Sequence, residues 1–178
     1  MSGASKSNIV LIGMPASGKS TLGVVLAKIM NLSFADMDLS IQTHMGKTLQ
    51  QIIDERGASG FLDVENSVLS NMEFSRTVIA TGGSAVYSEQ AMANLSQTGV
   101  VVYLKVGLDE LIERIGDLDE RGVVFKEGMG EDLEALFEER CPLYEKYADI
   151  TVDVGGMSIR DAARLVASKV REMYPESF

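Results

Sequence analysis

Short apolar runs alternate along this chain with longer segments whose apolar residues recur at helical spacing. Five of the runs are five to seven residues long and rich in β-branched residues, which is typical of buried strands. These runs span residues 8–13, 32–36, 77–81, 100–106 and 149–154. The segments between and after them predict helices over residues 21–30, 39–56, 61–74, 89–97, 108–115, 133–147 and 158–173, with Gly46 interrupting the second helix and Gly57 ending it.

This alternation of strands and helices predicts one α/β domain over residues 1–178. Strands that are apolar on both faces indicate a parallel sheet covered by helices, and such a sheet binds its ligands at the carboxyl ends of its strands. Residues 116–130 are polar and contain four glycines instead of a periodic pattern. We interpret this segment as a lid, with an ordinary surface loop as the alternative.

Composition narrows the range of partners. Sixteen basic residues against 26 acidic ones give a net charge of −10, a field that repels nucleic acid and anionic membranes. One cysteine and one histidine exclude an internal disulfide, a cysteine-based zinc cluster and a site with several histidines. The chain shows neither a run of about 20 apolar residues nor a signal peptide, so we expect a cytoplasmic protein that binds neither nucleic acid nor membrane.

The clearest chemical motif is GMPASGKS, a complete Walker A pattern placed between a predicted strand and a predicted helix. Its glycines allow backbone N–H groups to surround phosphate oxygens, and the helix N-terminus near Gly18 adds partial positive charge. Lys19 then reaches the β and γ phosphates and the Ser20 hydroxyl binds Mg²⁺. The alternative is a glycine-rich turn with an exposed lysine. The predicted nucleotide-binding residues are Gly13, Met14, Pro15, Ala16, Ser17, Gly18, Lys19, Ser20 and Thr21.

The carboxylate that assists the metal must come from elsewhere, because the run over residues 77–81 ends in Thr81 and not in an aspartate. Asp36 and Asp38 follow the second predicted strand, at the sheet edge where ligands bind. One of them could face magnesium and the other a substrate. The alternative is a structural role, as N-cap and first-turn acid of a helix that begins near Leu39, with Asp38 suited to the cap.

At this point the residues resemble the shikimate kinase family, over nearly the whole chain. The family's Asp-x-Asp and its Gly-x-x-x-Phe-Arg-x-x-Glu segment match Asp36-Met37-Asp38 and residues 57–65. Its glycine triplet matches Gly82-Gly83-Ser84. Its three arginines match Arg114 before the lid, Arg121 within it, and Arg140 in Arg-Cys-Pro-Leu-Tyr.

The resemblance implies a P-loop NTPase three-layer sandwich with a five-stranded parallel sheet in the order 2-3-1-4-5. ATP and Mg²⁺ would be cofactors, and a small hydroxylated acid would accept the phosphoryl group. By the same likeness Asp36 supports magnesium beside Ser20, and Asp38 orients or deprotonates the acceptor hydroxyl. Arg121 would close onto the phosphates.

The resemblance also places Arg114 against the adenine. Ordinary alternatives remain for two of the arginines. Arg114 could pair with Glu110 one helical turn away, and Arg140 could form an exposed ion pair on its own helix. For Arg121 and Arg140 a functional role is favoured, since positive charge near a lid is otherwise unexplained in so acidic a chain.

The chain departs from the family mainly where the acceptor would bind. Leu62 stands at the family's substrate-binding arginine, Ser84 at the third glycine and Ala58 at a glutamate, and Arg121 precedes Gly122-Val123-Val124 instead of Pro-Leu-Leu. Losing one charge-assisted arginine contact costs about 1.5 to 3 kcal/mol, which puts shikimate itself in question. The predicted acceptor-binding residues are Asp38, Leu62, Glu65, Gly82, Gly83, Ser84 and Arg140.

The acceptor therefore stays open between shikimate, another small hydroxy acid, and an amino-acid alcohol such as homoserine. Arg140 still offers a clamp for a carboxylate. Asp63 and Glu65, with no arginine at Leu62 to pair with, could face an ammonium group.

Two other functional classes compete with a small-molecule kinase. A GTPase switch is disfavoured because no Asn-Lys-x-Asp or Thr-Lys-x-Asp segment is present for guanine recognition. A non-catalytic nucleotide-binding regulator is disfavoured because it would not need an acceptor-side base such as Asp38. We expect a kinase that acts as a monomer or weak dimer and that binds ATP and a small acceptor.

Overall fold

The computed structural model describes residues 6–115 and 133–178. The predicted lid over residues 116–130, with Arg121, lies outside the described residues. The prediction of one domain over residues 1–178 stays a prediction.

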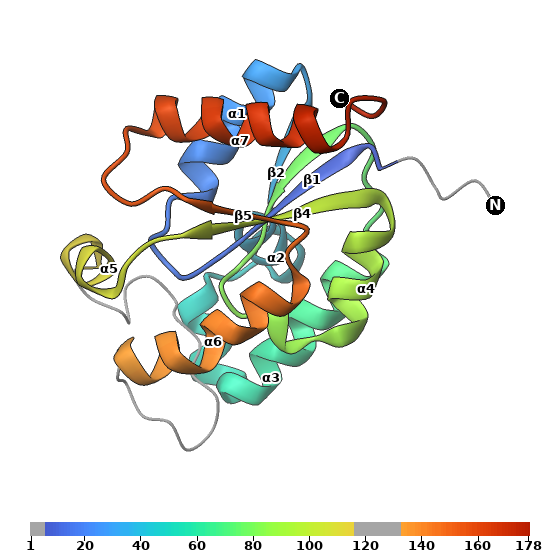
Figure 1. Cartoon of the computed structure of the whole chain (residues 1–178). Helices are drawn as coiled ribbons and strands as arrows, with labels where there is room; N and C mark the ends of the chain where they lie inside the picture. The colour runs from blue at the N-terminus through green and yellow to red at the C-terminus, as the bar shows by residue number, and fades with distance from the viewer. Residues whose placement is uncertain (1–5, 116–132) are drawn as a thin grey trace.

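Five parallel strands form a single sheet in the order β2-β3-β1-β4-β5, which confirms the predicted fold class and strand order (Figure 1). β1 lies in the middle and pairs with β3 through Leu11 and Ala80, and with β4 through Ile12 and Tyr103. The carboxyl ends of β1 and its neighbours therefore meet at one edge. The strands span Asn8–Ile12 (β1), Ser33–Asp36 (β2), Thr77–Ala80 (β3), Gly99–Lys105 (β4) and Ile150–Asp153 (β5).

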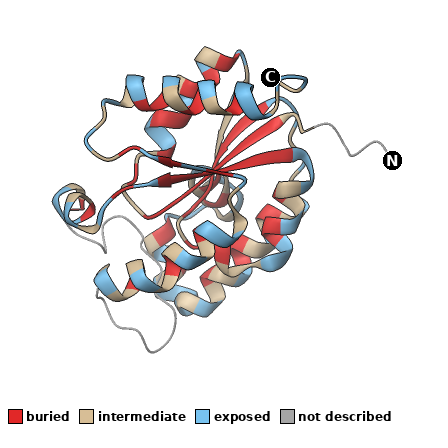
Figure 2. Cartoon of the chain, viewed as in Figure 1, coloured by how far each residue is buried: buried red, intermediate tan, exposed pale blue. Residues whose placement is uncertain are grey.

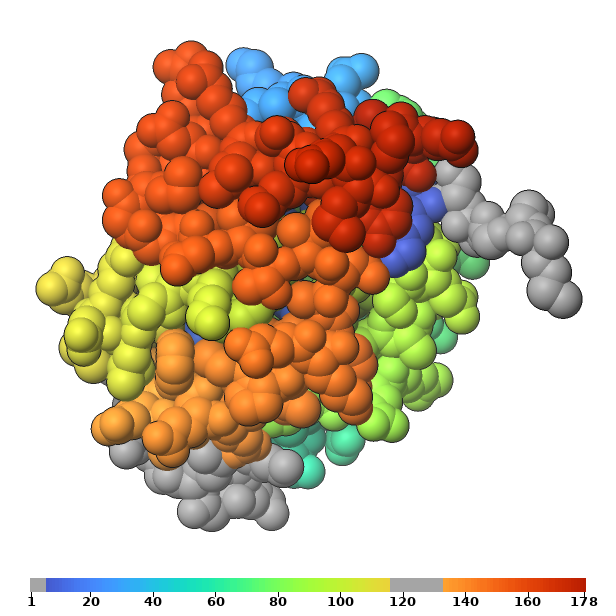
Figure 3. Space-filling model, in the orientation of Figure 1, coloured from blue at the N-terminus to red at the C-terminus, as the bar shows by residue number. Residues whose placement is uncertain are grey.

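Helices cover both faces of the sheet. α1 and α7 pack together on one face, while α3, α4 and α6 lie on the other (Figure 1). In the space-filling view α7 and α6 form much of the visible surface, with α5 beside them (Figure 3). Among the described residues, no helix combines the length and apolar character needed to span a bilayer. The helices span Lys19–Met30 (α1), Met37–Met45 (α2), Leu49–Asn71 (α3), Ala85–Tyr87 (η1, a 3₁₀ turn), Glu89–Thr98 (α4), Leu108–Arg114 (α5), Leu133–Tyr147 (α6) and Ile159–Met173 (α7).

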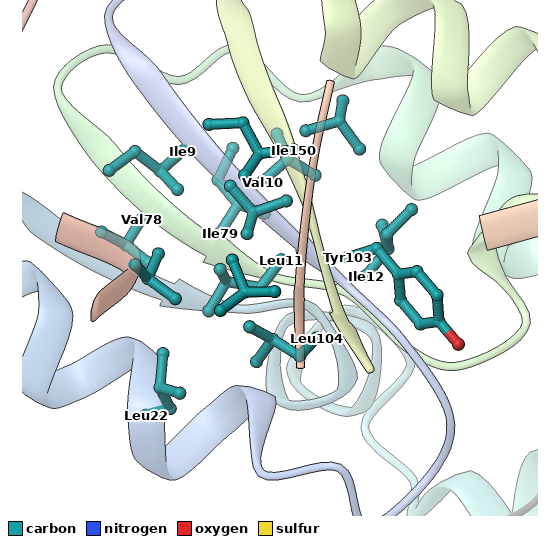
Figure 4. Packing of buried hydrophobic residues seen from close by; sticks show 14 of the residues in the cluster. Ile9, Val10, Leu11, Ile12, Leu22, Val78, Ile79, Tyr103, Leu104 and Ile150 are labelled. Carbon is teal, nitrogen blue, oxygen red and sulfur yellow. The ribbon is translucent and has the colours of Figure 1, made fainter. Parts of the chain in front are cut away.

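The core lies along the central strands. Every residue of β1 is buried, and the buried strands contrast with the exposed outer faces of the helices (Figure 2). Side chains of β1, β3 and β4 pack against one another and against Leu22 of α1 (Figure 4). A second apolar cluster joins α2 to α3 through Ile41, Ile52 and Phe61. This second cluster fixes the position of α3 beside the carboxyl edge of the sheet.

Among the helix boundaries that differ from the sequence prediction, two lie close to the predicted site residues. α2 begins at Met37 and not at Leu39, because the Asp36 side chain caps it by accepting a hydrogen bond from the Leu39 N–H at 3.2 Å. The cap is therefore Asp36, and Asp38 lies in the first helical turn. Gly57 breaks the helical backbone as predicted, with φ of 70°, but the helix resumes directly after it instead of at Phe61.

Asn8 ties the beginning of β1 to three neighbouring segments. Its side chain is 1% exposed, donates to Phe74 O at 2.8 Å and to Thr98 Oγ1 at 3.1 Å, and accepts from Thr77 N at 3.0 Å. Asn8→Ala should lower the free energy of unfolding by about 1 to 3 kcal/mol, because it leaves the buried Thr77 N–H without its acceptor. Urea unfolding measures this. Asn71→Ala, which removes an exposed side chain at the end of α3, should change stability much less.

Candidate active site

The P-loop connects β1 to α1 at the carboxyl edge of the sheet. Gly18 has φ of 94° and caps α1 without a side chain, so the first N–H groups of the helix are left for a ligand. Ala16 also has a positive φ, of 63°. This backbone leaves N–H groups at the beginning of α1 available to an anion, which is the arrangement that the Walker A pattern predicts.

The alternative of a glycine-rich turn with an exposed lysine requires Lys19 to project into solvent, and it does not. Its side chain is 8% exposed, and Nζ donates to Gly13 O and Met14 O, each at 2.8 Å. Burial lowers the pKa of the ammonium group to about 8, partly offset by the negative charge of Asp38. The ammonium group is thus held inside the loop, where the phosphates of a nucleotide would meet it.

Ser20 and Asp36 form an oxygen-rich pair beside the P-loop. Ser20 Oγ donates to Asp36 Oδ2 at 2.5 Å, while Asp36 Oδ1 caps α2. The capping role is therefore filled by Asp36, and its role at magnesium stays a prediction. Among the described residues, no group of three or more His, Cys, Asp or Glu side chains could hold a metal alone. One hydroxyl, one carboxylate and phosphate oxygens make a set that fits Mg²⁺, which commonly keeps waters and substrate oxygens as ligands.

A cavity of about 320 Å³ extends from the P-loop to the opposite wall of the site. Its lining comes from the segments that follow β1, β2 and β3 at the same edge, together with one residue of α3 and one of α6. This volume suits a small metabolite or part of a nucleotide. The lining residues are Pro15, Ala16, Gly18, Lys19, Ser20, Thr21, Asp38, Phe61, Thr81, Gly82, Gly83, Ser84 and Arg140.

Asp38 faces this cavity, whereas Asp36 faces Ser20. The two acids are not on one strand face: Asp36 ends β2 and Asp38 begins the helix, which directs them to different partners. Burial and the charge of Asp36 raise the pKa of Asp38, and Lys19 opposes that shift. A carboxylate with a raised pKa is suited to accept a proton from a substrate hydroxyl.

The loop after β3 closely approaches the carboxylates of Asp38 and Glu65. A Cβ atom at Gly82 would lie 2.7 Å from Glu65 Oε1 and 2.9 Å from Asp38 Oδ1, so a larger residue here would displace these carboxylates. Two residues after Gly82, Ser84 donates a hydrogen bond from Oγ to Glu65 Oε2 at 2.6 Å. Glu65 is 2% exposed, and burial, reinforced by Asp38, raises its pKa to about 7 despite the Ser84 hydrogen bond.

Arg140 is a wall residue of the cavity and not an exposed helix residue, so that alternative is wrong. Its side chain is 1% exposed and Nε donates to the Tyr87 hydroxyl at 3.0 Å. Its guanidinium carbon also lies 5.1 Å from the centre of the Tyr87 ring. Tyr144 of the same helix donates to Gly83 O at 2.7 Å and so fixes α6 to the loop.

Several predicted site residues do not line this cavity, namely Gly13, Met14, Ser17, Asp36, Leu62, Glu65 and Arg114. Leu62 is half-buried and packs with the α2–α3 apolar cluster. Arg114 pairs with Glu110, as the ordinary alternative held, and its Nη1 also donates to Ala16 O of the P-loop at 3.2 Å. Arg114 therefore stands beside the nucleotide-binding loop with its position fixed by Glu110.

Sequence reasoning missed Thr81, Phe61, Tyr87 and Tyr144. Thr81 directly follows a strand at the ligand-binding edge, and Phe61 and Tyr144 stand inside segments already singled out. These three sequence positions were the signals that could have placed Thr81, Phe61 and Tyr144 in the site. Tyr87 had none, because its contact with Arg140 joins elements 53 residues apart.

A P-loop at the carboxyl edge of an all-parallel sheet, facing a small cavity with its own acid and arginine, defines a P-loop kinase. Comparison with known proteins identifies the family. A model of the family described as shikimate kinase matches residues 15–171. The chain therefore belongs to the shikimate kinase family.

Individual proteins similar to this chain are also named as shikimate kinases. Shikimate kinase of Actinobacillus pleuropneumoniae serotype 5b is 36% identical over 171 residues, covering 96% of each chain. Shikimate kinase 1 of Yersinia pestis is 37% identical over 172 residues, covering 96% of this chain and 97% of the relative. The structure of shikimate kinase from Acinetobacter baumannii in complex with shikimate superposes with a TM-score of 0.84 at 29% identity, covering 94% of each chain. The protein is an ATP-dependent phosphotransferase acting on a hydroxyl group, with ATP and Mg²⁺ as cofactors.

Lys19→Ala should reduce turnover by at least about 10²-fold, because it removes the cation placed at the phosphates. The fold should persist, since among the described residues Nζ donates only to Gly13, Met14 and Ser17 of the P-loop itself. A coupled assay for ADP and circular dichroism measure the two effects. Lys28→Ala, at an exposed position of α1, is the matched control. Turnover by Lys19→Ala at the level of this control would contradict the assignment.

Proposed function

We propose that the chain transfers the γ-phosphoryl group of ATP to the hydroxyl of a small hydroxy acid held between Asp38 and Arg140. The observation that carries this proposal is that the half-buried Asp38 and the buried Arg140 line the same 320 Å³ cavity as Lys19. The volume restricts the acceptor to a small molecule. Arg140 supplies the charge that a carboxylate needs, since a guanidinium pairs with it in a bidentate manner.

In the proposed reaction the acceptor oxygen forms a bond to the γ-phosphorus while the bond to the β–γ bridging oxygen breaks. Asp38 orients the acceptor hydroxyl and takes its proton as that bond forms. Lys19 and the N–H groups at the beginning of α1 stabilise the charge that spreads over the phosphate oxygens. Ser20 and Asp36 would hold Mg²⁺, which neutralises phosphate charge when bound.

The remaining nucleotide contacts are also proposals. Arg114, held by Glu110 beside Ala16, is in position to lie against the base or sugar of ATP. Arg121, which we expect to close onto the phosphates, lies outside the described residues and stays a prediction. A cytoplasmic location, a monomer or weak dimer, and the absence of nucleic acid and membrane partners stay expectations from charge and composition.

The identity of the acceptor turns on position 62. A leucine there offers no charge for a substrate carboxylate, and it packs instead with apolar neighbours between α2 and α3. The names of the relatives make shikimate one candidate. The other candidates are another small hydroxy acid and an amino-acid alcohol such as homoserine, whose carboxylate would reach Arg140 and whose hydroxyl would reach Asp38.

Asp38→Asn should lower kcat by about 10² to 10⁴-fold, the usual value of a positioned general base. ATP affinity should stay unchanged, because Ser20 and Asp36, and not Asp38, stand where the metal would bind. Steady-state kinetics with saturating acceptor and nucleotide titration separate the two quantities. Asp54→Asn, at an exposed position of α3, is the control. A loss confined to ATP binding would assign Asp38 to the metal and contradict the proposed role.

A further inference from the structure

A second cavity, the side pocket, adjoins the acceptor end of the main cavity. It has a volume of about 220 Å³, and Ser84 lines both cavities. No part of the catalytic arrangement described above uses it. The residues that line the side pocket are Leu62, Asp63, Glu65, Asn66, Ser84, Tyr87 and Ser88.

Two hydroxyl groups of the side pocket, those of Ser84 and Ser88, already donate their protons within the protein. Ser84 Oγ donates its proton to Glu65, and Ser88 Oγ donates its proton to Asn66 Oδ1. A hydroxyl that has donated its one proton offers a ligand only its lone pairs. Among the described residues that line the side pocket there is no lysine or arginine, whereas Asp63 and Glu65 are acids. This chemistry matches a ligand group that donates several hydrogen bonds and carries positive charge.

Glu65 supplies an independent indication of a missing partner. Its carboxylate is almost fully buried, and Oε1 has no hydrogen-bond partner within the described part of the chain. That oxygen faces Gly82, next to Asp38, and both Gly82 and Asp38 line the main cavity. A buried acceptor without a donor is costly, and native proteins seldom keep one unless a ligand, ion or water completes it.

The wall of the main cavity next to the side pocket carries the positive charge of Arg140 and would bind an anion. A Cβ atom at Gly83 would lie 2.9 Å from Nη1 of Arg140, so the guanidinium stands just beyond the loop residue that separates Gly82 from Ser84. A position for an anion thus adjoins a position for a cation. Together they match the paired carboxylate and ammonium of an α-amino acid.

We propose that Glu65 and Ser84 form a subsite for an ammonium group of the phosphoryl acceptor, which is then a hydroxylated α-amino acid. This inference rests on the proposed kinase function and names its substrate class. Arg140 holds the carboxylate, Glu65 and Ser84 hold the ammonium, and the side-chain hydroxyl reaches Asp38. Homoserine has these three groups. Shikimate has a carboxylate and hydroxyls but no ammonium.

The charge state of Glu65 makes this subsite sensitive to pH. Its pKa is raised to about 7 before a ligand binds, so below pH 7 the carboxyl group is mostly neutral. The other charged and titratable groups around it are Asp38 from α2, Arg140 from α6, Tyr87 from η1 and Asp63 from α3 itself. An ammonium ligand binds the ionised form, and therefore its affinity should rise as pH increases from 6 to 8.

The test compares homoserine with 4-hydroxybutyrate, which has the same carbon chain, carboxylate and hydroxyl but no ammonium group. Binding is measured by calorimetry with ADP and Mg²⁺ present. Homoserine should bind at least about tenfold more tightly at pH 8, the effect of one charge-assisted contact, and this advantage should shrink at pH 6. The affinity for 4-hydroxybutyrate should depend much less on pH.

Glu65→Gln should remove the homoserine advantage and leave the affinity for 4-hydroxybutyrate nearly unchanged. Glu73→Gln, the same change at an exposed acid, is the matched control. Leu62→Arg is the second variant: it introduces a guanidinium beside Glu65, so it should weaken homoserine binding while sparing 4-hydroxybutyrate. Thermal unfolding of each variant verifies that it is folded.

The outcomes separate the subsite from the kinase. Equal binding of the two ligands by the unmodified protein, or equal loss of both in Glu65→Gln, overturns the subsite. Efficient phosphorylation of shikimate without binding of homoserine overturns the subsite and retains the kinase. Tight, Glu65-dependent binding of homoserine without phosphorylation of it or of any hydroxy acid supports the subsite and contradicts the proposed transfer to a hydroxyl of this class.

Discussion

The position of β1 at the centre of an all-parallel sheet is the constraint on which the site depends. Because every strand runs the same way, the P-loop after β1, the acids after β2 and the glycines after β3 leave the sheet at one edge. Residues remote in sequence thereby line one cavity. A chain with a net charge of −10 can then bind a polyanion, since Lys19 and the N–H groups at the beginning of α1 act at contact distance whatever the overall field.

The charges in that cavity are divided by function. Asp36 bonds to Ser20 and caps α2, whereas Asp38 lines the cavity in which we propose that the acceptor binds. Burial disfavours the charged forms of both Lys19 and Glu65. It therefore lowers the pKa of Lys19 to about 8 and raises the pKa of Glu65 to about 7. Both groups are therefore sensitive to a charged ligand at neutral pH, the lysine to phosphate and the glutamate to a cation.

Local patterns predicted most of this architecture. The β-branched runs predicted the strands, and the Walker A spacing predicted the path of the P-loop, because the strands and the loop depend on residues adjacent in sequence. The beginning of α2 was misplaced because Asp36 competes with Asp38 for the cap, and only the backbone geometry decides between them. The burial of Arg140 could not be predicted, since it depends on how α6 packs against Tyr87 and the loop after β3. The Glu65–Ser84 bond joins residues 19 positions apart on different elements, so Ser84 appeared only as a departure from the family pattern.

The central claim is that a small hydroxy acid, and not water, receives the phosphoryl group at Asp38. Phosphorus NMR of the protein with ATP, Mg²⁺ and either homoserine or shikimate tests it directly. The account predicts that ADP and one new phosphomonoester resonance appear in equal amounts with one of these acceptors. Release of inorganic phosphate in place of the ester, or unchanged ATP with both acceptors, would contradict it.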